Sequence, residues 1–180
     1  MKDIVDTPPD YLIPYLIHFG EKRITPKVLG VEGGEALRLE KVPGRRLGML
    51  LQDENDPGPL RLREIYSVLG RHVGYIAKFN VIHTDLHTEN VVVEDDYPII
   101  VDWERGECHP FLNSDPMYWH GHSSDLLLKT TKVRLEQAEF PQMYEILQRY
   151  YTDAFLEELN THTEIDKEEL YRKANKMGWF

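Results

Sequence analysis

The spacing of apolar residues along the chain predicts helices that alternate with short hairpins. Between residues 62 and 76, apolar side chains recur every three or four positions, which is the period of an amphipathic helix. Two β-type runs flank Gly33-Gly34, and two more surround the acidic turn of "VVVEDDYPIIVD" (91–102), so each pair predicts a β-hairpin. Residues 104–124, which are rich in Gly, Pro and His, are expected to be irregular, and the chain from Asp125 onward to be mainly helical.

Helix-start signals complete this outline at both ends of the chain. Thr7-Pro8 is typical of an N-cap followed by proline in the first helical position, but Pro14 would disrupt a helix interior. We therefore expect a short, kinked or restarted helix over 7–20. Asp166 predicts the N-cap of the last helix. The order helix, hairpin, helix, loop, hairpin, helices is typical of an α+β fold weighted toward helix.

The composition excludes several classes of protein. The chain has 180 residues, of which 41% are hydrophobic and 29% charged, as in an ordinary globular protein with a sizeable core. Its net charge of −10 argues against non-specific binding of nucleic acid, which needs clustered Lys and Arg. A single cysteine, Cys108, favours a reducing compartment. No apolar run approaches the roughly 20 residues of a membrane span, and the N-terminus does not resemble a signal peptide, so we expect a cytoplasmic protein without a membrane partner.

The stretch "VIHTDLHTEN" (81–90) places titratable and amide side chains between two apolar segments. Asp85 and Asn90 are five positions apart, and Asp102 follows the second strand of the second predicted hairpin. A hydroxyl that attacks a phosphoryl group needs a carboxylate to orient it and to accept its proton. It also needs oxygen ligands, such as an amide and a second carboxylate, to hold Mg²⁺ against the nucleotide phosphates. These three residues are therefore the candidates for phosphoryl-transfer chemistry.

The same residues resemble those of a known family. "HTDLHTEN" resembles the catalytic loop of the protein kinase-like superfamily, His-Arg-Asp-Leu-x-x-x-Asn, and "IIVDWE" resembles the strand and the metal-binding aspartate that follow it. The resemblance implies that Asp85 is the catalytic base and that Asn90 and Asp102 are magnesium ligands. It also implies that His83 supports the backbone of the loop. ATP and Mg²⁺ are then the expected cofactors.

Departures from the kinase pattern narrow the resemblance to one branch. Thr84 stands in place of the usual arginine, His87 follows the Asp-Leu pair, and Trp103-Glu104 replaces Phe-Gly. These features are similar to aminoglycoside and choline phosphotransferases, RIO-type kinases and the small kinase of the KEOPS complex. The missing arginine implies that no phosphorylated activation loop is read. For His87, a structural contact is favoured over a direct role in chemistry.

Two flanking motifs extend the resemblance. "LRLEKVPGRRL" (37–47) resembles the strand, hinge and start of the C-lobe in those kinases. This implies that adenine is hydrogen-bonded by the backbone of three consecutive residues, Glu40, Lys41 and Val42. "SSDLLL" (123–128) resembles the C-lobe segment that carries a buried aspartate, which implies that Asp125 braces the catalytic loop.

The resemblance implies a kinase-like α+β fold made mainly of the helical C-lobe, with two β-hairpins and a reduced N-lobe. Residues 1–43 would form the N-lobe remnant and hinge hairpin, and residues 44–180 the helical C-lobe with the catalytic loop. No Gly-x-Gly-x-x-Gly loop and no strand lysine of the Val-Ala-Ile-Lys type precede the hinge. As an alternative, Gly33-Gly34 would be a shrunken phosphate loop with Lys41 as the lysine, but "VPGRRL" fits a hinge better.

The expected function is Mg-ATP-dependent transfer of the γ-phosphoryl group to an alcohol, either in a small molecule or in a protein Ser/Thr side chain. The intact set of Asp85, Asn90 and Asp102 favours this enzyme. The missing lysine favours a pseudokinase instead, a module that binds nucleotide or a protein partner without catalysis. A third alternative is a partner chain that completes the N-lobe, for which an exposed apolar strip beside the hinge strands would be the sign. The expected partners are a nucleotide and a hydroxyl acceptor, and no nucleic acid.

Overall fold

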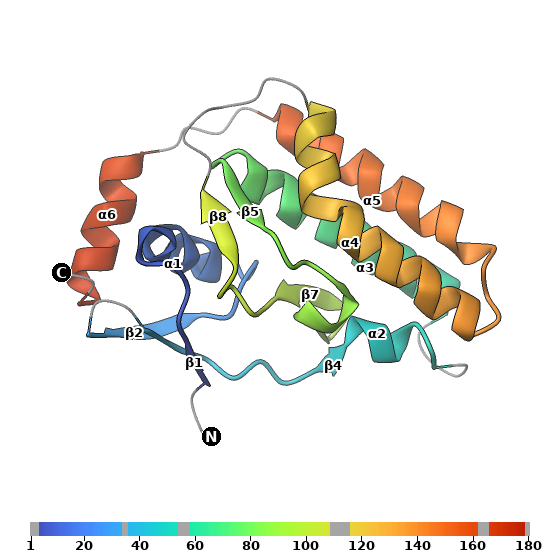
Figure 1. The fold of residues 1–180 in the computed structure, drawn as a ribbon, viewed down its shortest axis with the longest axis horizontal. Coiled ribbons are helices and arrows are strands. Elements are labelled where there is room, and N and C mark those ends of the chain that lie inside the picture. The colour runs from blue at the N-terminus through green and yellow to red at the C-terminus, as the bar shows by residue number, and fades with distance from the viewer. Residues whose placement is uncertain (1–3, 34–35, 54–57, 109–115, 162–165, 179–180) are drawn as a thin grey trace.

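The N-terminal part of the chain forms a small sheet with one helix against it (Figure 1). The structure is a computed structural model that describes residues 4–33, 36–53, 58–108, 116–161 and 166–178. The sheet is antiparallel with strand order β1-β3-β2, and this part of the chain comprises β1 (Ile4–Asp6), a 3₁₀ turn (Asp10–Leu12), α1 (Ile13–Glu21), β2 (Val28–Glu32) and β3 (Ala36–Leu39). The predicted β2–β3 hairpin is confirmed, and its turn contains Gly33 with a φ of +64°, which glycine adopts without strain.

The first helix begins later than the sequence predicts. The 3₁₀ turn leads into α1, so Pro14 occupies the first turn of the helix rather than its interior. Proline is tolerated there because the N–H groups of the first turn have no partner inside the helix. The helix is therefore short, as predicted, but it does not begin at Thr7 and Pro14 does not interrupt it.

The second predicted hairpin is also confirmed, and a short strand that was not predicted extends it. β6 (Val91–Glu94) and β7 (Tyr97–Ile100) pair antiparallel, and β4 (Arg45–Arg46) pairs with β6, which gives the strand order β4-β6-β7. The turn residues Asp95 and Asp96 have φ values of +47° and +68°. Two consecutive residues with positive φ are typical of the type I′ turn, whose twist matches that of a two-residue hairpin.

Three long helices form the other end of the molecule, α3 (Pro59–Ala77), α4 (Pro116–Gln137) and α5 (Met143–Asn160), and a short helix, α2 (Leu47–Leu50), precedes them. The helix predicted over 62–76 is confirmed as α3. Glycine lets α3 and α5 approach closely. A Cβ atom at Gly70 would lie 2.2 Å from the Tyr151 carbonyl oxygen, and one at Gly74 would lie 2.6 Å from the Phe155 carbonyl oxygen.

Residues 104–124 are more regular than the sequence predicts. β8 (Gly106–Cys108) pairs antiparallel with β5 (Val81–His83), and α4 begins at Pro116. Residues 109–115 of this stretch lie outside the described residues. Each of the two strands has three residues and finds its partner far along the chain, so the local hydrophobic pattern carries little signal for them.

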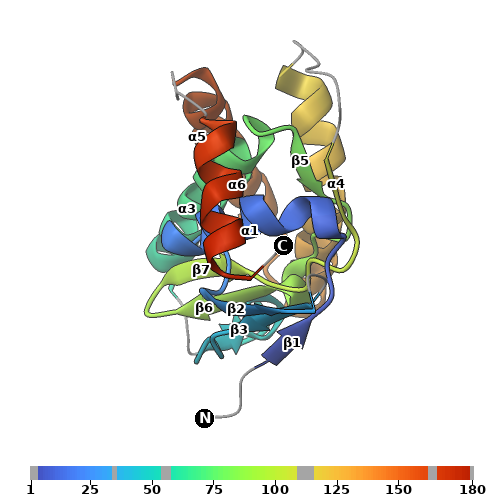
Figure 2. The ribbon, with the colours of Figure 1, turned by 90° about the vertical axis from the view of Figure 1, so that its left-hand side faces the viewer.

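The last helix, α6 (Lys167–Lys176), lies against α1 (Figure 2). Lys173 Nζ donates a hydrogen bond to Glu21 Oε2 at 2.7 Å, which links the two helices. Asp166 is the N-cap, as predicted, because its carboxylate accepts the backbone N–H three positions later at 3.0 Å. The predicted domain boundary after residue 43 therefore assigns α1 and α6 to different domains, although the two helices pack against each other.

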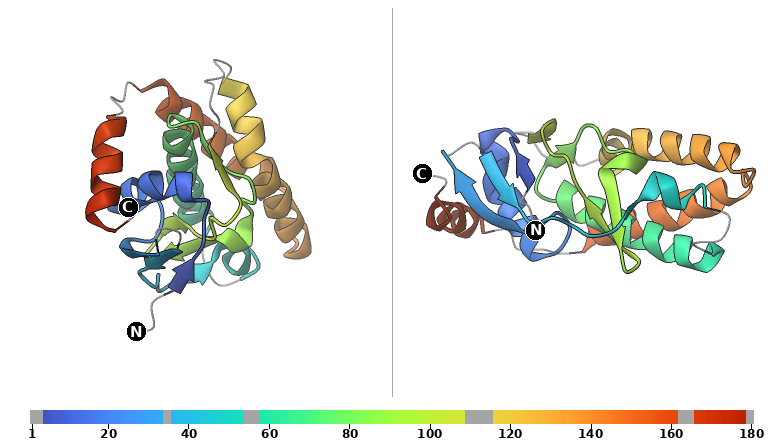
Figure 3. Two further views of the ribbon diagram at one scale, coloured as in Figure 1. Left: turned by 60° about the vertical axis from the view of Figure 1, so that its left-hand side comes forward. Right: turned by 90° about the horizontal axis from the view of Figure 1, so that it is seen from below.

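The small N-terminal sheet and the three long helices lie at opposite ends of the molecule, and the segment between β3 and β4 runs from one to the other (Figure 3). One hydrophobic core connects both ends, since its buried cluster includes Phe19 of α1, Trp103 after β7 and Phe155 of α5. Among the helices of the described residues, none is both long and apolar enough to cross a membrane. The fold is thus a mixed α+β arrangement with the 81–90 loop near its middle.

Candidate active site

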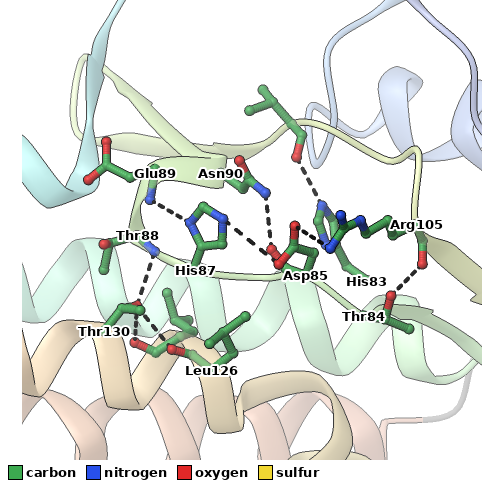
Figure 4. A network of polar contacts seen from close by, with 12 residues as sticks. His83, Thr84, Asp85, His87, Thr88, Glu89, Asn90, Arg105, Leu126 and Thr130 are labelled. Atoms are coloured by element: carbon green, nitrogen blue, oxygen red, sulfur yellow. Dashed lines mark hydrogen bonds and ion pairs between the residues drawn. The ribbon is translucent and has the colours of Figure 1, made fainter.

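The loop between β5 and β6 carries two of the three predicted catalytic residues (Figure 4). It ends in a 3₁₀ turn, Thr88–Asn90, that leads directly into β6. His87 caps this turn, because its Nδ1 accepts a hydrogen bond from the Glu89 N–H at 3.2 Å. On the side of α4, the Thr88 N–H donates to Thr130 Oγ1 at 3.2 Å. The loop is thereby held by a strand at each end and by a helix behind it.

Asn90 is buried and is held through both its side chain and its backbone. Its Nδ2 donates to the Asp85 carbonyl oxygen at 3.0 Å, which leaves Oδ1 without a hydrogen-bond donor in the described part of the chain. Its own carbonyl oxygen accepts the Val101 N–H at 2.9 Å. Because Val101 precedes Asp102, these bonds connect the three residues that the sequence predicts as catalytic.

Asp102 follows β7 with a left-handed backbone, at a φ of +65°. Residues other than glycine adopt this conformation rarely, Asp and Asn more readily than most, at a cost of roughly 1–3 kcal/mol. Its side chain is exposed and makes no hydrogen bond or ion pair with the described residues. A strained backbone that carries an uncommitted carboxylate is typical of a functional position.

Asp85 lies between two basic side chains, neither of which is close enough for a hydrogen bond. His87 Nε2 is 3.9 Å from Asp85 Oδ1, and Arg105 Nη1 is 3.8 Å from Asp85 Oδ2. Both oxygens of Asp85 can therefore still accept a hydrogen bond from a hydroxyl group. Because His87 Nδ1 accepts the Glu89 N–H, the neutral ring carries its proton on Nε2, the nitrogen that faces Asp85.

His83, which the sequence predicts to support the backbone of the loop, binds the backbone of the segment that follows β7. It is buried, and its Nε2 lies 2.9 Å from the Val101 carbonyl oxygen. Its ring packs edge-on against Trp103, with ring centroids 4.6 Å apart. Burial lowers the pKa of His83, so the ring is neutral at neutral pH and Nε2 donates to the carbonyl oxygen. The residue fixes the segment that leads to Asp102.

Asp6 is a site residue that the sequence analysis missed. β1 places it next to Asp102 and Glu104, with 7% of its surface exposed, and its Oδ2 accepts the Trp103 N–H at 3.3 Å. Burial raises the pKa of Asp6, and repulsion from Asp102 and Glu104 raises it further. The sequence signal is a single charge in "IVDTPP", with no motif around it. Its approach to the site depends on the pairing of β1 with β3.

A cleft of about 400 Å³ joins Asp102 to the segment that follows β3. Its lining includes all three residues predicted to bind adenine, together with Asp6, Arg46 and Asp102. Asp85 and Asn90 are not among the described lining residues. Their loop is nevertheless connected to the cleft, because Arg46 Nη1 donates to the Glu89 carbonyl oxygen at 2.5 Å.

The backbone of the segment 40–42 has hydrogen-bonding groups that remain available. The Glu40 N–H donates to the Lys27 carbonyl oxygen at 2.8 Å and is therefore not free for a ligand. The backbone groups of Lys41 and Val42 make no hydrogen bond within the described residues. The predicted contacts with adenine are thus narrowed to the Glu40 carbonyl oxygen and to the backbone of the next two residues.

A larger hollow of about 530 Å³ lies next to the cleft and shares Pro26, Glu40 and Val42 with it. Its described lining includes neither Asp102 nor any residue of the 81–90 loop. We assign the candidate site to the smaller cleft, because it brings the segment 40–42 and Asp102 to one space.

The predicted role of Asp125 is wrong. Asp125 is exposed on α4, where its Oδ2 pairs with Lys129 Nζ at 2.6 Å. Ser124 and Leu127 are buried, so the helical period turns position 125 toward solvent. The contacts from α4 to the catalytic loop come instead from Thr130 and from Arg134, whose Nη2 donates to Glu89 Oε1 at 3.0 Å.

The alternative phosphate loop finds no support in the structure. Lys41 lies after the end of β3 rather than on a strand, and Gly33 is not among the described residues that line the cleft. An exposed apolar strip beside the hinge strands would indicate a partner chain. Among the residues of β2 and β3 whose exposure is described, Leu29 is the one large apolar side chain that is exposed, at 40%.

Asn90 and Asp102 each offer side-chain oxygen atoms of the kind that Mg²⁺ prefers. The free Asn90 Oδ1 and the uncommitted Asp102 carboxylate are both hard oxygen donors. Among the described residues, no group of three or more His, Cys, Asp or Glu side chains is arranged to hold a metal ion. A site with few protein ligands is typical of Mg²⁺, which keeps several waters and takes further oxygen ligands from substrate phosphates.

Comparison with known proteins does not assign this geometry to a family. No family model matches the sequence, and no curated protein matches it significantly. The function is therefore inferred from the residues and their geometry.

Proposed function

We propose that the chain is a small kinase-like phosphotransferase that uses Mg-ATP to phosphorylate an alcohol. The observation that carries the proposal is the cleft between the segment 40–42 and Asp102, next to the loop that holds Asp85 and Asn90. The order of the elements supports it as well. A small sheet with one helix, a connecting segment, and a helical part with a polar loop before a hairpin is the order expected of a kinase-like fold with a reduced N-lobe.

Each residue of the set has a distinct role in the proposed reaction. Asp85, whose carboxylate oxygens have no hydrogen-bond donor within the described residues, orients the acceptor hydroxyl and accepts its proton. Asn90 Oδ1 and the Asp102 carboxylate hold Mg²⁺, which when bound neutralises charge on the nucleotide phosphates. The segment 40–42 orients adenine through its backbone. In this arrangement the protein positions the reactants and supplies little covalent chemistry of its own.

The acceptor hydroxyl belongs to a small molecule or to a protein Ser/Thr side chain. His87 and Trp103 favour the small molecule, because at these positions the sequence resembles aminoglycoside and choline phosphotransferases. We also propose that the protein acts in the cytoplasm, because its single cysteine cannot form a disulfide within the chain.

Asp6 favours a second candidate function, a module that binds nucleotide or a protein partner without catalysis. In the kinases that the sequence resembles, a strand lysine contacts the phosphates. In this chain a buried carboxylate on β1 lines the cleft, close to Asp102 and Glu104. Negative charge at this wall repels phosphate groups, which weakens Mg-ATP binding and slows transfer.

The rate of ATP hydrolysis, in which water replaces the acceptor, separates the two candidates. Asp85→Asn keeps the size of the side chain but removes the proton acceptor, so we expect the rate to fall by roughly 10²–10⁴. Asp125→Asn makes the same change on the exposed face of α4 and should leave the rate unchanged. ATP binding without turnover in the wild-type protein would support the non-catalytic module, and equal turnover in Asp85→Asn would exclude the proposed role of that residue.

A further inference from the structure

We infer that Arg46 binds the phosphate groups of the ligand in the cleft. The inference rests on the proposed function and adds a phosphate-binding residue to it. The charged side chains that line the cleft comprise four carboxylates and two cations, namely Asp6, Glu40, Asp102, Glu104, Lys41 and Arg46. A polyanionic ligand therefore meets more negative than positive charge, and the position of the two cations determines where its phosphates bind.

Arg46 has no carboxylate partner in the described part of the chain. Its side chain is exposed, and its Nη1 donates to the neutral carbonyl oxygen of Glu89 at 2.5 Å. The neighbouring Arg45 differs, because its Nη2 pairs with Asp53 Oδ2 at 2.8 Å. No carboxylate of the described residues therefore compensates the charge of the Arg46 guanidinium group. Several of its N–H donors remain available, in the planar arrangement that fits phosphate oxygens.

The position of Arg46 assigns it to the phosphate end of the cleft. Glu89 immediately precedes Asn90, so the hydrogen bond to its carbonyl oxygen ties Arg46 to a proposed magnesium ligand. The backbone of Arg46 is fixed as well, because β4 pairs it with Val92 of β6. Lys41, the other cation, belongs to the segment proposed to bind adenine. Arg46 thus supplies the positive charge that the missing strand lysine would provide.

Affinities for Mg-ATP and for adenosine, measured by NMR titration, test this inference in the full chain. Arg46→Gln removes the charge of an exposed side chain and should leave the fold intact. We expect it to weaken Mg-ATP binding about tenfold, the effect of one charge-assisted hydrogen bond, and to leave adenosine binding unchanged. Arg45→Gln is the matched control. It should change neither affinity, because Arg45 is paired with Asp53 and is not among the described cleft residues.

Each other outcome overturns the inference in a distinguishable way. Equal Mg-ATP affinity in Arg46→Gln and wild type would overturn it and leave the proposed function standing. Equal losses of Mg-ATP and adenosine affinity would also overturn it, because Arg46 would then act on the shape of the loop through Glu89. Equal losses in Arg46→Gln and Arg45→Gln would indicate an effect of overall charge. If the wild-type protein binds neither ligand at millimolar concentration, the proposed function fails, and the inference fails with it.

Discussion

Replacement of Gly70 by alanine tests how closely α3 and α5 pack. A Cβ atom at Gly70 would lie 2.2 Å from the carbonyl oxygen of Tyr151 and 3.0 Å from its carbonyl carbon. Both are backbone atoms of α5 and cannot rotate away, so the helices must separate. Overpacking costs about 1–3 kcal/mol, and a contact with backbone belongs at the upper end. Alanine recovers about 1 kcal/mol as the better helix former, so we expect Gly70→Ala to lower the free energy of unfolding by about 2 kcal/mol.

Gly121→Ala is the matched control, because Gly121 lies in α4 and, apart from the adjoining helix backbone, no atom of the described residues lies within 4 Å of its Cβ position. It should raise the free energy of unfolding by about 1 kcal/mol through helix propensity alone. In a domain of this size, 1 kcal/mol corresponds to about 2–4 °C in Tm. Thermal unfolding should therefore show a Tm about 4–8 °C lower for Gly70→Ala, and about 2–4 °C higher for Gly121→Ala. An equal rise in both variants would refute the close packing.

Two further predictions concern buried titratable groups. Burial lowers the pKa of His72 to about 4, so between about pH 4 and 6.5 the unfolded chain binds a proton that the folded chain does not. The stability that neutral His72 contributes is therefore lost as the pH falls through this window. Urea unfolding at pH 7 and at pH 5 should show that the free energy of unfolding falls by roughly 2 kcal/mol less in His72→Gln than in the wild type. Equal falls in the two proteins would exclude this role of His72. Burial raises the pKa of Asp6, so its stabilising contribution is present at low pH and is lost as the pH rises through the folded pKa. Asp6→Asn should therefore raise Tm at pH 7 and raise it less at pH 4, and a lower Tm at pH 7 would contradict this reasoning.

The helices and strands whose determining residues lie close together along the chain could be predicted from the sequence. The apolar period over 62–76 specifies the buried face of α3 without reference to the rest of the chain. The two hairpins depend on turns whose residues adopt positive φ, Gly33 in the first and Asp95 with Asp96 in the second. In each case the signal lies within a few positions of the structure it determines.

The elements that depend on distant contacts could not be predicted in the same way. β5 and β8 pair across more than 20 intervening residues, and β1 pairs with β3 across the whole of α1. The error at Asp125 has a related cause. Which side of α4 faces the core depends on where that helix begins and on what it packs against, and neither can be read from "SSDLLL" alone.

The residues of the candidate site could be selected from the sequence, but the side chains that surround them could not. Asp85, Asn90 and Asp102 belong to short motifs, so their types and spacing are visible in the sequence. Asp6 and Arg46 reach the cleft through the pairing of β1 with β3 and of β4 with β6. These two residues add one carboxylate and one guanidinium group to the cleft, and their arrangement is a property of the folded chain.

The central claim, that Asp102 holds Mg²⁺ for a bound nucleotide, is tested most directly by thermal unfolding with ATP in the presence and absence of Mg²⁺. Asp102→Asn is the variant of choice, because asparagine tolerates the left-handed backbone at this position. At a ligand concentration a hundred times Kd, binding stabilises the folded state by about 2.7 kcal/mol, or roughly 5–11 °C in Tm. We predict a Mg²⁺-dependent rise in the wild-type protein that is lost in Asp102→Asn. A rise of equal size in the variant, or no rise in the wild type at millimolar ATP, would contradict the claim.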